Sequence, residues 1–392
     1  MGCFRFGEIV LPKEPDVRNW AVVACDQYSS NPAYWRGLEE SLTPPTTLNL
    51  IFPEAYLNAP GKEKRIRSII ETQARYAADG LFRAVDGTVV LKRETAYGHT
   101  HHGLMLLVDL DDYSVVRGEK TLIRATEAVV PERVPPRVAV RKDCLLELPH
   151  IMALYDDPAD SVLGPYRAAS APVLYEGELN GNGGRITGYQ VTDTRGLSAA
   201  LDALVLRAKR VYGEELLFLV GDGNHSLATA KACRTDANPK SKYALVEAVN
   251  IYDPGILFEP IHRVIHGIDA ADFLAAYAAR IKGGARTAGY VGGDAVRLFV
   301  PENAIDAVKA VDAFLEAYQA EKGGEIDYIH GEAELKAVAS RTGGVGIVLR
   351  KMQKEALFPY IVQHGPLPKK TFSMGEADEK RYYIEARYIR SC

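Results

Sequence analysis

The feature that most constrains the fold is an apolar run that ends in a glycine-rich turn and continues as a helix-like segment. Residues 216–220 read LLFLV, which is too short for an ordinary helix and predicts a buried strand. Residues 221–226 read GDGNHS, and the Ala, Leu and Lys residues that follow favour a helix. We therefore predict a corner at which a strand of an α/β fold passes directly into a helix.

The glycines and amides of this corner are suited to holding an anion. Gly221 and Gly223 allow positive φ angles and close approach of the backbone, and Asp222 or Asn224 can cap the new helix. The first N–H groups of a helix favour negative charge. The corner is therefore a candidate site for a phosphate or a carboxylate.

His225 and Ser226 add polar side chains beside these amides. The alternative interpretation is a tight connection in which the glycines only turn the chain and His225 bonds a local carbonyl group. The corner has neither the G-x-x-x-x-G-K-[ST] phosphate loop nor the G-x-G-x-x-G fingerprint. Spacing alone therefore leaves both interpretations open.

Composition restricts the class of protein. A chain of 392 residues exceeds what one hydrophobic core usually serves, so two or three domains are expected. The formal net charge of −4 offers no broad attraction to nucleic acid or to an anionic membrane. No segment reaches the roughly 18 apolar residues of a membrane span, and the five cysteines are scattered without a C-x-x-C pair. We expect a cytoplasmic protein whose partner is a small phosphorylated or anionic metabolite.

Hydrophobic periodicity predicts a mixed α/β architecture in three segments, residues 1–120, 121–268 and 269–392, of which the second contains the corner. The predicted strands are residues 20–25, 47–52, 87–93, 103–110, 171–175, 185–192, 216–220, 243–251, 255–264, 296–300 and 344–350. The predicted helices include residues 31–42, 62–78 and 197–211, and two Ala-rich helices flank residues 296–300. Residues 126–149 are rich in proline and are expected to form a long loop.

The charged residues of segment 123–141 form a second candidate feature. Arg124 and Arg137 could supply forked phosphate donors, and Glu127 could supply a carboxylate base. The alternative is a charged surface loop whose residues form local ion pairs.

Two further candidates follow later in the chain. His262 and Arg263 come at the end of a buried-looking strand and could reach a site, although a histidine bonded to the backbone is the more frequent outcome. Lys369 and Lys370 form a compact cationic patch that either is solvated or closes over a phosphate.

Three clustered histidines raise a metal hypothesis. The H-x-H pair of His99 and His101 can place two imidazoles on one face of a strand, and His102 follows directly. No nearby Asp or Cys pattern completes a ligand set, so a solvated hairpin loop is the alternative. We assign no metal ligand from the sequence.

Several ordered segments resemble family ten-fifteen of the domains of unknown function. The matching segments begin at Trp20, Thr47, Leu122, Glu147, Val220, Phe258 and Pro368, and they read WAVVACDQY, TLNLIFPEAYL, LIRATEAVVPERVPPR, ELPHIMALYDDP, VGDGNHSLATAK, FEPIHRVI and PKKTFSMGEADEKRYYIEARYI. The corner is similar to the phosphate-binding turn of the ParB and sulfiredoxin superfamily, which includes nucleotide-using enzymes such as free serine kinase. The resemblance implies a ParB/sulfiredoxin-like nucleotide-binding core with additional α/β subdomains. In that superfamily an arginine commonly follows the histidine, whereas this chain has Ser226.

These observations lead to the hypothesis of a kinase-like phosphotransferase or a phosphohydrolase that binds a nucleotide with Mg²⁺ at residues 221–226. Glu127 or Asp222 would orient or deprotonate the acceptor, and His225 and Arg124 would stabilise the developing phosphate charge. Two alternatives stay open: a non-catalytic metabolite sensor or scaffold, and a metal-dependent hydrolase centred on the three histidines. We expect a homodimer and no nucleic-acid or membrane partner.

Overall fold

The computed structural model describes residues 2–116, 118–167 and 171–390. The chain divides into two compact units, one of residues 1–256 and 377–392 and one of residues 257–376. The first unit therefore contains the first segment expected from the sequence, most of the second and the last residues of the third, whereas residues 257–268 lie in the second unit. The polypeptide leaves this unit after residue 256 and re-enters it at residue 377.

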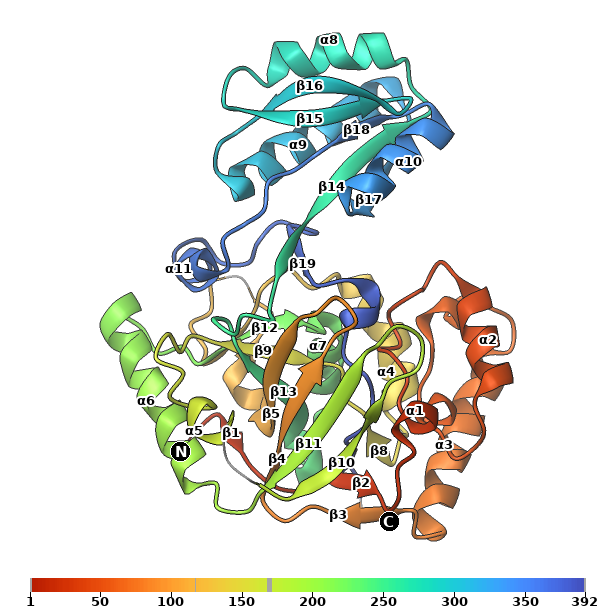
Figure 1. Cartoon of the computed structure of the whole chain (residues 1–392), viewed down its shortest axis with the longest axis vertical. Helices are drawn as coiled ribbons and strands as arrows, with labels where there is room; N and C mark the ends of the chain where they lie inside the picture. Colours follow the sequence, from red (N-terminus) through yellow and green to blue (C-terminus); the bar gives the residue numbers. More distant parts are fainter. Residues whose placement is uncertain (1, 117, 168–170, 391–392) are drawn as a thin grey trace. The chain divides into compact units, whose positions relative to one another are not determined.

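A ten-stranded mixed sheet forms the centre of the first unit. Its strands are β1 (Phe4–Arg5), β4 (Thr88–Glu94), β5 (Thr100–Asp109), β6 (Tyr113–Ser114), β7 (Ile123–Ala125), β9 (Met152–Tyr155), β10 (Val173–Glu178), β11 (Arg185–Val191), β12 (Phe218–Asp222) and β13 (Tyr243–Asn250). Their order is β10-β11-β4-β5-β13-β9-β12-β7-β6, and β1 pairs with β5. Figure 1 labels the strands of this order from β10 to β12, and β1. The pairs β13–β9, β12–β7 and β6–β7 are parallel, and the other pairs are antiparallel.

Helices and two small sheets complete the first unit. The helices are α1 (Val17–Trp20), α2 (Pro32–Ser41), α3 (Lys62–Ala78), α4 (Val134–Arg141), α5 (Gly164–Arg167), α6 (Arg195–Tyr212) and α7 (Asn224–Ala232). The small sheets pair β2 (Val10–Pro12) with β3 (Phe82–Ala84) and β8 (Leu146–Glu147) with β20 (Arg387–Tyr388). The predicted helices at residues 31–42, 62–78 and 197–211 are confirmed as α2, α3 and α6.

The alternation of side chains along β5 shows how the central sheet is buried. Leu104 and Leu106 lie in one core cluster with apolar residues of α6 and α7. Met105 and Leu107 lie in another cluster with residues of the N-terminal region and with Tyr382. Because successive strand residues point to opposite faces, both faces of the sheet are covered. The apolar residues of β5 are therefore buried on both sides.

The second unit contains a smaller antiparallel sheet. Its strands are β14 (Phe258–His266), β15 (Ala285–Val291), β16 (Asp294–Val300), β17 (Glu325–His330), β18 (Val345–Ile347) and β19 (Phe372–Met374), and its helices are α8 (Ala270–Arg280), α9 (Ala304–Lys322), α10 (Glu332–Thr342) and α11 (Leu357–His364). The order is β16-β15-β18-β14-β17, with β19 paired to β14 (Figure 1). Ile265 of β14 packs in the cluster with α8 and α9, and Val264 packs with α10, so helices cover both faces.

Two strand predictions are wrong for identifiable reasons. Residues 20–25 form no regular strand: Trp20 ends α1, and only Val23 makes an isolated bridge, to Tyr382. Residues 47–52 begin with a 3-10 turn, Thr47–Asn49, because the hydroxyl of Thr46 accepts from Leu48 N. Both segments are apolar because tertiary contacts bury them from several sides, and a short buried run is ambiguous without its neighbours.

The proline-rich segment 126–149 is not an irregular loop. It contains the 3-10 turn Pro131–Arg133, helix α4 and strand β8. Pro135 and Pro136 lie in the first turn of α4, where the missing N–H groups have no partner inside the helix. Their presence is therefore compatible with a helix start. No helix within the described residues combines the length and the apolar character needed to cross a bilayer.

Candidate functional site

The predicted corner lies where β12 ends and α7 begins. Gly221 and Asp222 are the last two residues of β12, and Asn224 is the first residue of α7. Gly223 between them has a φ of 82°, and a Cβ atom at this position would lie 3.0 Å from the Cα atom of Ile151. A glycine meets both conditions without strain. The strand-to-helix prediction is confirmed.

The N-terminus of α7 presents backbone amides that precede the helical hydrogen bonds. The first such bond runs from the N–H of Leu227 to the carbonyl oxygen of Gly223, after the amides of Asn224, His225 and Ser226. Among the residues that the structure describes, no side chain caps this end. These amides carry the positive end of the helix dipole and favour an anion.

The side chains of Asp222 and Asn224 organise the turn. Asp222 Oδ1 accepts a hydrogen bond of 2.9 Å from the N–H of Gly223, and Oδ2 lies 3.3 Å from Nζ of Lys380. Asn224 Nδ2 donates to the carbonyl oxygen of Val220 at 3.1 Å. Its Oδ1 is buried and accepts no hydrogen bond from any described residue. A buried amide oxygen without a donor is unusual and leaves a place for a donor from a ligand or a water molecule.

The segment 123–141 reaches this corner. Thr126 Oγ1 donates to the carbonyl oxygen of Val220 at 2.6 Å, and the N–H of Val130 donates to Nε2 of His225 at 3.1 Å. Nε2 is therefore an acceptor, and the proton of a neutral His225 ring resides on Nδ1. Glu127 is half-buried and lies in sequence between these two contacts. The structure thus places the predicted carboxylate on the segment that packs beside the corner.

Ser226 starts a chain of polar contacts that leads to the C-terminal segment. Ser226 Oγ lies 3.0 Å from Nε2 of His150, and Nδ1 of His150 lies 2.8 Å from the hydroxyl of Tyr383. That hydroxyl also accepts from the N–H of Cys25 at 3.0 Å. Asp26 Oδ2 lies 3.7 Å from Nε2 of His150. Four distant parts of the sequence therefore meet at the first turn of α7.

The charges of this cluster are fixed by their neighbours. Burial would raise the pKa of Asp26, but the imidazole of His150, the amide of Gln27 and the ammonium of Lys380 hold that pKa below its ordinary value. Burial raises the pKa of Tyr383 well above its ordinary value, so its hydroxyl keeps the proton. The cluster therefore combines an ionised carboxylate with a neutral phenol.

A cavity of about 150 Å³ adjoins these groups. Its polar lining includes Ser226, Thr229, His150 and Tyr383, together with an ion pair between Arg137 and Glu54. Burial raises the pKa of Glu54, and the guanidinium of Arg137 offsets part of that rise. The N-terminal turn of α7 thus contributes to the lining of a space that can receive a small molecule.

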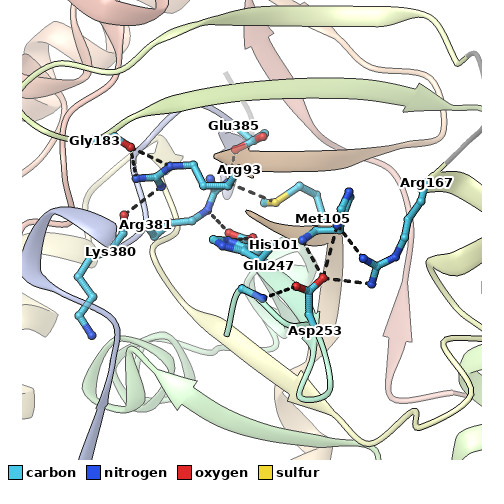
Figure 2. A network of polar contacts seen from close by, with 12 residues as sticks. Arg93, His101, Met105, Arg167, Gly183, Glu247, Asp253, Lys380, Arg381 and Glu385 are labelled. Carbon is cyan, nitrogen blue, oxygen red and sulfur yellow. Dashed lines mark hydrogen bonds and ion pairs between the residues drawn. The ribbon is translucent and has the colours of Figure 1, made fainter. Parts of the chain in front are cut away.

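The segment that carries Lys380 is held by the guanidinium of Arg93 from β4 (Figure 2). Arg93 donates to the carbonyl oxygens of Gly183 at 2.7 Å, of Asp378 at 3.2 Å and of Lys380 at 3.2 Å. The ring of Tyr382 lies 4.9 Å from the guanidinium. Since Arg93 is only 2% exposed, this clamp is part of the interior. It fixes the backbone that positions the Lys380 ammonium.

The next residue, Arg381, belongs to the same buried network (Figure 2). Its Nε lies 2.8 Å from Oε2 of Glu247, and its Nη2 pairs with Glu385. The ring of His101 lies 3.6 Å from the other oxygen of Glu247. Burial would raise the pKa of Glu247, but Arg381 and His101 hold it below its ordinary value. Lys380 and Arg381 therefore serve two different clusters from adjacent positions.

Two predicted phosphate donors of segment 123–141 already pair with carboxylates. Arg124 Nη1 lies 2.7 Å from Oε1 of Glu214, and Arg124 is 8% exposed. Arg137 pairs with Glu54 inside the lining of the cavity. Arg137 is thus brought to the site, whereas the contacts of Arg124 are with Glu214 and with the carbonyl oxygen of Thr121.

His262 and Arg263 lie on β14 in the second unit. Arg263 is fully buried, and its Nε and Nη2 donate to Asp312 at 2.6 Å and 3.0 Å. His262 Nδ1 accepts from the N–H of Leu349 at 3.1 Å. These contacts all lie within the second unit, as do the exposed side chains of Lys369 and Lys370.

The three clustered histidines have separate carboxylate partners. His99 Nδ1 lies 2.9 Å from Glu379, His101 faces Glu247, and His102 Nδ1 lies 3.4 Å from Asp253. Within residues 2–116, 118–167 and 171–390, no group of three or more His, Cys, Asp or Glu side chains is arranged to hold a metal ion.

Four residues of the site were not identified from the sequence. They are Asp26, His150, Lys380 and Tyr383. Each stands in one of the segments that carry the family resemblance, but neither spacing nor periodicity links these segments to the corner. Only the resemblance itself was a signal that could have found them.

The sequence matches a family model described as "Protein of unknown function (DUF1015)" over residues 6–386. A search of curated proteins finds no match. Among solved structures, a conserved hypothetical protein from Pyrococcus furiosus is 11% identical with a TM-score of 0.37, and the match covers 71% of this chain and 90% of that one. A free serine kinase variant in complex with AMP is 10% identical with a TM-score of 0.40, covering 71% and 87%. SbnI with a C-terminal truncation from Staphylococcus aureus is 10% identical with a TM-score of 0.38, covering 71% and 82%.

Proposed function

This chain belongs to the DUF1015 family, and we propose that it binds a phosphorylated small molecule, a nucleotide in the first instance, at the N-terminus of α7. We further propose that it transfers a phosphoryl group from this ligand to an acceptor hydroxyl or to water. The observation that carries the proposal is the first turn of α7, which no side chain of the described residues caps. Just before this turn, the Lys380 ammonium lies 3.3 Å from Asp222, and Ser226 within the turn lines a cavity.

The electrostatics of the corner support phosphate binding. The amides of Asn224, His225 and Ser226 carry partial positive charge, and Lys380 adds a full positive charge beside them. Gly223 has no side chain that would keep a phosphate away from these amides. Arg124 contacts Glu214, whereas Lys380 contacts Asp222 at the corner itself, so we assign the cationic role to Lys380.

For the proposed phosphoryl transfer, the protein has to position the phosphate and the acceptor and to stabilise the charge on the phosphoryl group. The acceptor oxygen forms a bond to phosphorus while the bond from phosphorus to the leaving oxygen breaks, and a carboxylate takes the acceptor proton. Glu127 and Asp222 remain the proposed groups for orienting or deprotonating the acceptor, and Asp26 joins them as an ionised carboxylate. His225 bonds the N–H of Val130 and so holds the segment of Glu127 against the corner.

Mg²⁺ fits the oxygen donors of this corner. Asp222, whose Oδ2 faces Lys380, would hold the ion together with phosphate oxygens and water. A bound Mg²⁺ neutralises charge on the transferring phosphoryl group. The side chains themselves would position the phosphate and the acceptor.

Calorimetric titration with ATP, ADP, AMP and CTP, with and without Mg²⁺, tests binding. We expect saturable binding by wild type and a loss of about tenfold or more in affinity for Lys380→Met. Lys369→Met removes an exposed cation of the second unit and should leave the affinity unchanged. Absence of binding by wild type at millimolar nucleotide would contradict the proposal. Phosphorus NMR of the same mixtures then detects transfer or hydrolysis.

A non-catalytic metabolite sensor is the second candidate. It is favoured by one observation: Asp222 already accepts from Gly223 N and faces Lys380, so this carboxylate is part of the turn. This candidate predicts that ligand raises the melting temperature without any turnover. Glu127→Gln would then leave the affinity intact, and no phosphate product would form with wild type.

A further inference from the structure

The cavity beside the α7 N-terminus has the size of a small organic molecule. Its volume of about 150 Å³ equals that of an engineered apolar protein cavity that stays dry and binds benzene. The phosphate site proposed above uses backbone amides at its edge and leaves the interior of the cavity unassigned. The residues that line the interior determine which class of molecule it accepts.

Most of the wall is apolar and buried. Leu50, Ile51 and Phe52 line the cavity and are 2%, 7% and 5% exposed. Leu57 and Val140 add partly buried side chains from the segment before α3 and from α4. Such a wall stabilises an apolar body and offers no hydrogen bonds to a polar one.

The charged groups of the lining are balanced. Arg137 pairs with Glu54, and Arg141 pairs with Glu147, so the two cations and two carboxylates neutralise one another. Glu147 also accepts from the N–H of Leu245 and from Arg387. A charged ligand would have to displace one of these pairs at a large desolvation cost. The lining therefore favours a neutral ligand.

The polar end of the cavity is suited to a hydroxyl group. Ser226 Oγ lies 3.0 Å from His150 Nε2, and a serine hydroxyl has one donor and two acceptor positions. An alcohol can both donate to and accept from such a group, whereas a hydrocarbon leaves it unmatched. The same serine lies in the turn whose amides face the proposed phosphate.

We propose that this cavity binds a small neutral alcohol with a compact, benzene-sized apolar body and with its hydroxyl directed to Ser226 and His150. Its role as phosphoryl acceptor rests on the proposed function, but its binding does not. In that role the alcohol oxygen forms the new bond to phosphorus, the bond to the leaving oxygen of the phosphorylated donor breaks, and the hydroxyl proton passes through Ser226 and His150 Nε2 to Asp26, whose Oδ2 lies 3.7 Å from that nitrogen.

Benzyl alcohol, toluene and benzoate are matched probes that share an aromatic body and differ in the head group. Ligand-observed NMR titrations on the full chain should show saturable binding of benzyl alcohol. Toluene and benzoate should bind about tenfold more weakly, since one lacks the hydroxyl and the other carries a charge. Equal affinity for benzyl alcohol and toluene, or no binding of benzyl alcohol up to its solubility limit, would overturn the proposal.

Two substitutions fill the cavity. Leu57→Trp and Val140→Phe enlarge partly buried side chains that line it, so at least one should fold. Each should abolish benzyl alcohol binding and leave ATP affinity unchanged. Leu206→Trp enlarges an exposed side chain of α6 and should affect neither ligand. Benzyl alcohol binding that survives in a folded filling variant would show that the ligand lies elsewhere.

ATP titrations on the same samples separate the two proposals. If ATP binds and benzyl alcohol does not, the alcohol site is wrong and the proposed function stands. If benzyl alcohol binds and ATP does not, the cavity ligand stands and its role as acceptor is wrong. Ser226→Ala adds a check on the head group, because it should reduce the preference for benzyl alcohol over toluene.

Discussion

Lys380 and Arg381 are adjacent in the sequence but belong to polar clusters of different kinds. Arg381 lies in a closed cluster, in which Glu247 and Glu385 neutralise it and no water-sized space is left. Lys380 lies in an open cluster with Asp222 and Asp26, and Asp26 contacts His150, which lines the cavity. Similar residue types thus support the fold in one cluster and, in the other, lie at the corner where we propose that a ligand binds. The two clusters differ because the open cluster contacts a residue of the cavity lining.

The largest expected effect comes from breaking the closed cluster. Arg381→Met leaves Glu247 and Glu385 buried without their cation, so the free energy of unfolding should fall by about 3–5 kcal/mol. Urea unfolding followed by circular dichroism measures this. Arg185→Met removes exposed ion pairs with Glu176 and Glu178 and is the control. Equal destabilisation by the two variants would refute the distinction between clusters.

A smaller effect is expected from a change in the backbone of the open cluster. Gly223→Ala places a methyl group at a φ of 82° and 3.0 Å from Ile151. We expect a loss of about 2–3 kcal/mol in unfolding free energy and weaker ATP binding. Gly213 has a φ of 77° with nothing near its Cβ position, so Gly213→Ala should cost about 1 kcal/mol. The difference between the two losses in unfolding free energy measures the steric contact with Ile151. Equal losses would show that the backbone at the corner shifts to accommodate the methyl group.

The pH dependence of stability tests the charge of the open cluster. The folded pKa of Asp26 is below its ordinary value, so the folded state binds this proton less readily than the unfolded state. The stabilisation is therefore present above the unfolded pKa and is lost as pH falls through the folded pKa. Melting temperatures measured from about pH 6 down to about pH 3 should fall less steeply for Asp26→Asn than for wild type. Parallel curves would contradict the pairing of Asp26 with His150 and Lys380.

The smallest effect is expected for Ser226→Ala. It removes one hydroxyl and its contact with His150, which should lower the free energy of unfolding by about 1 kcal/mol. The three backbone amides remain, so ATP affinity should change by about threefold or less. Calorimetry on the purified variant tests this expectation. Complete loss of ATP binding would mean that the serine hydroxyl, and not the α7 amides, holds the phosphate.

Local patterns predicted much of the fold. Helix α3 begins and ends at the predicted residues, and the boundaries of α2 and α6 differ by one or two positions. Periodicity succeeds there because one face of each helix is buried and the other is solvated. It failed at residues 20–25 and 47–52, whose apolar side chains are buried in irregular backbone by distant segments. Burial alone does not identify a strand.

The candidate site also contains a part that was predictable from the sequence and a part that was not. The corner at Gly223 was predictable because a strand, a turn with positive φ and a helix start are all local features. Lys380 and His150 were not, because their distance from the corner depends on the return of the chain at residue 377 and on the path between β8 and β9. Arg124, which we predicted to be a phosphate donor, pairs with Glu214. The spacing of residues in the sequence could not indicate this pair.

The amino-acid sequence was sufficient to predict the β12–α7 corner and the helices with clear amphipathic periodicity, because these depend on interactions between residues a few positions apart. Which distant charged side chains lie at that corner became known only from the three-dimensional fold. Ion pairs and cavities form between segments separated by a hundred or more residues, and their geometry follows from packing that no local pattern encodes.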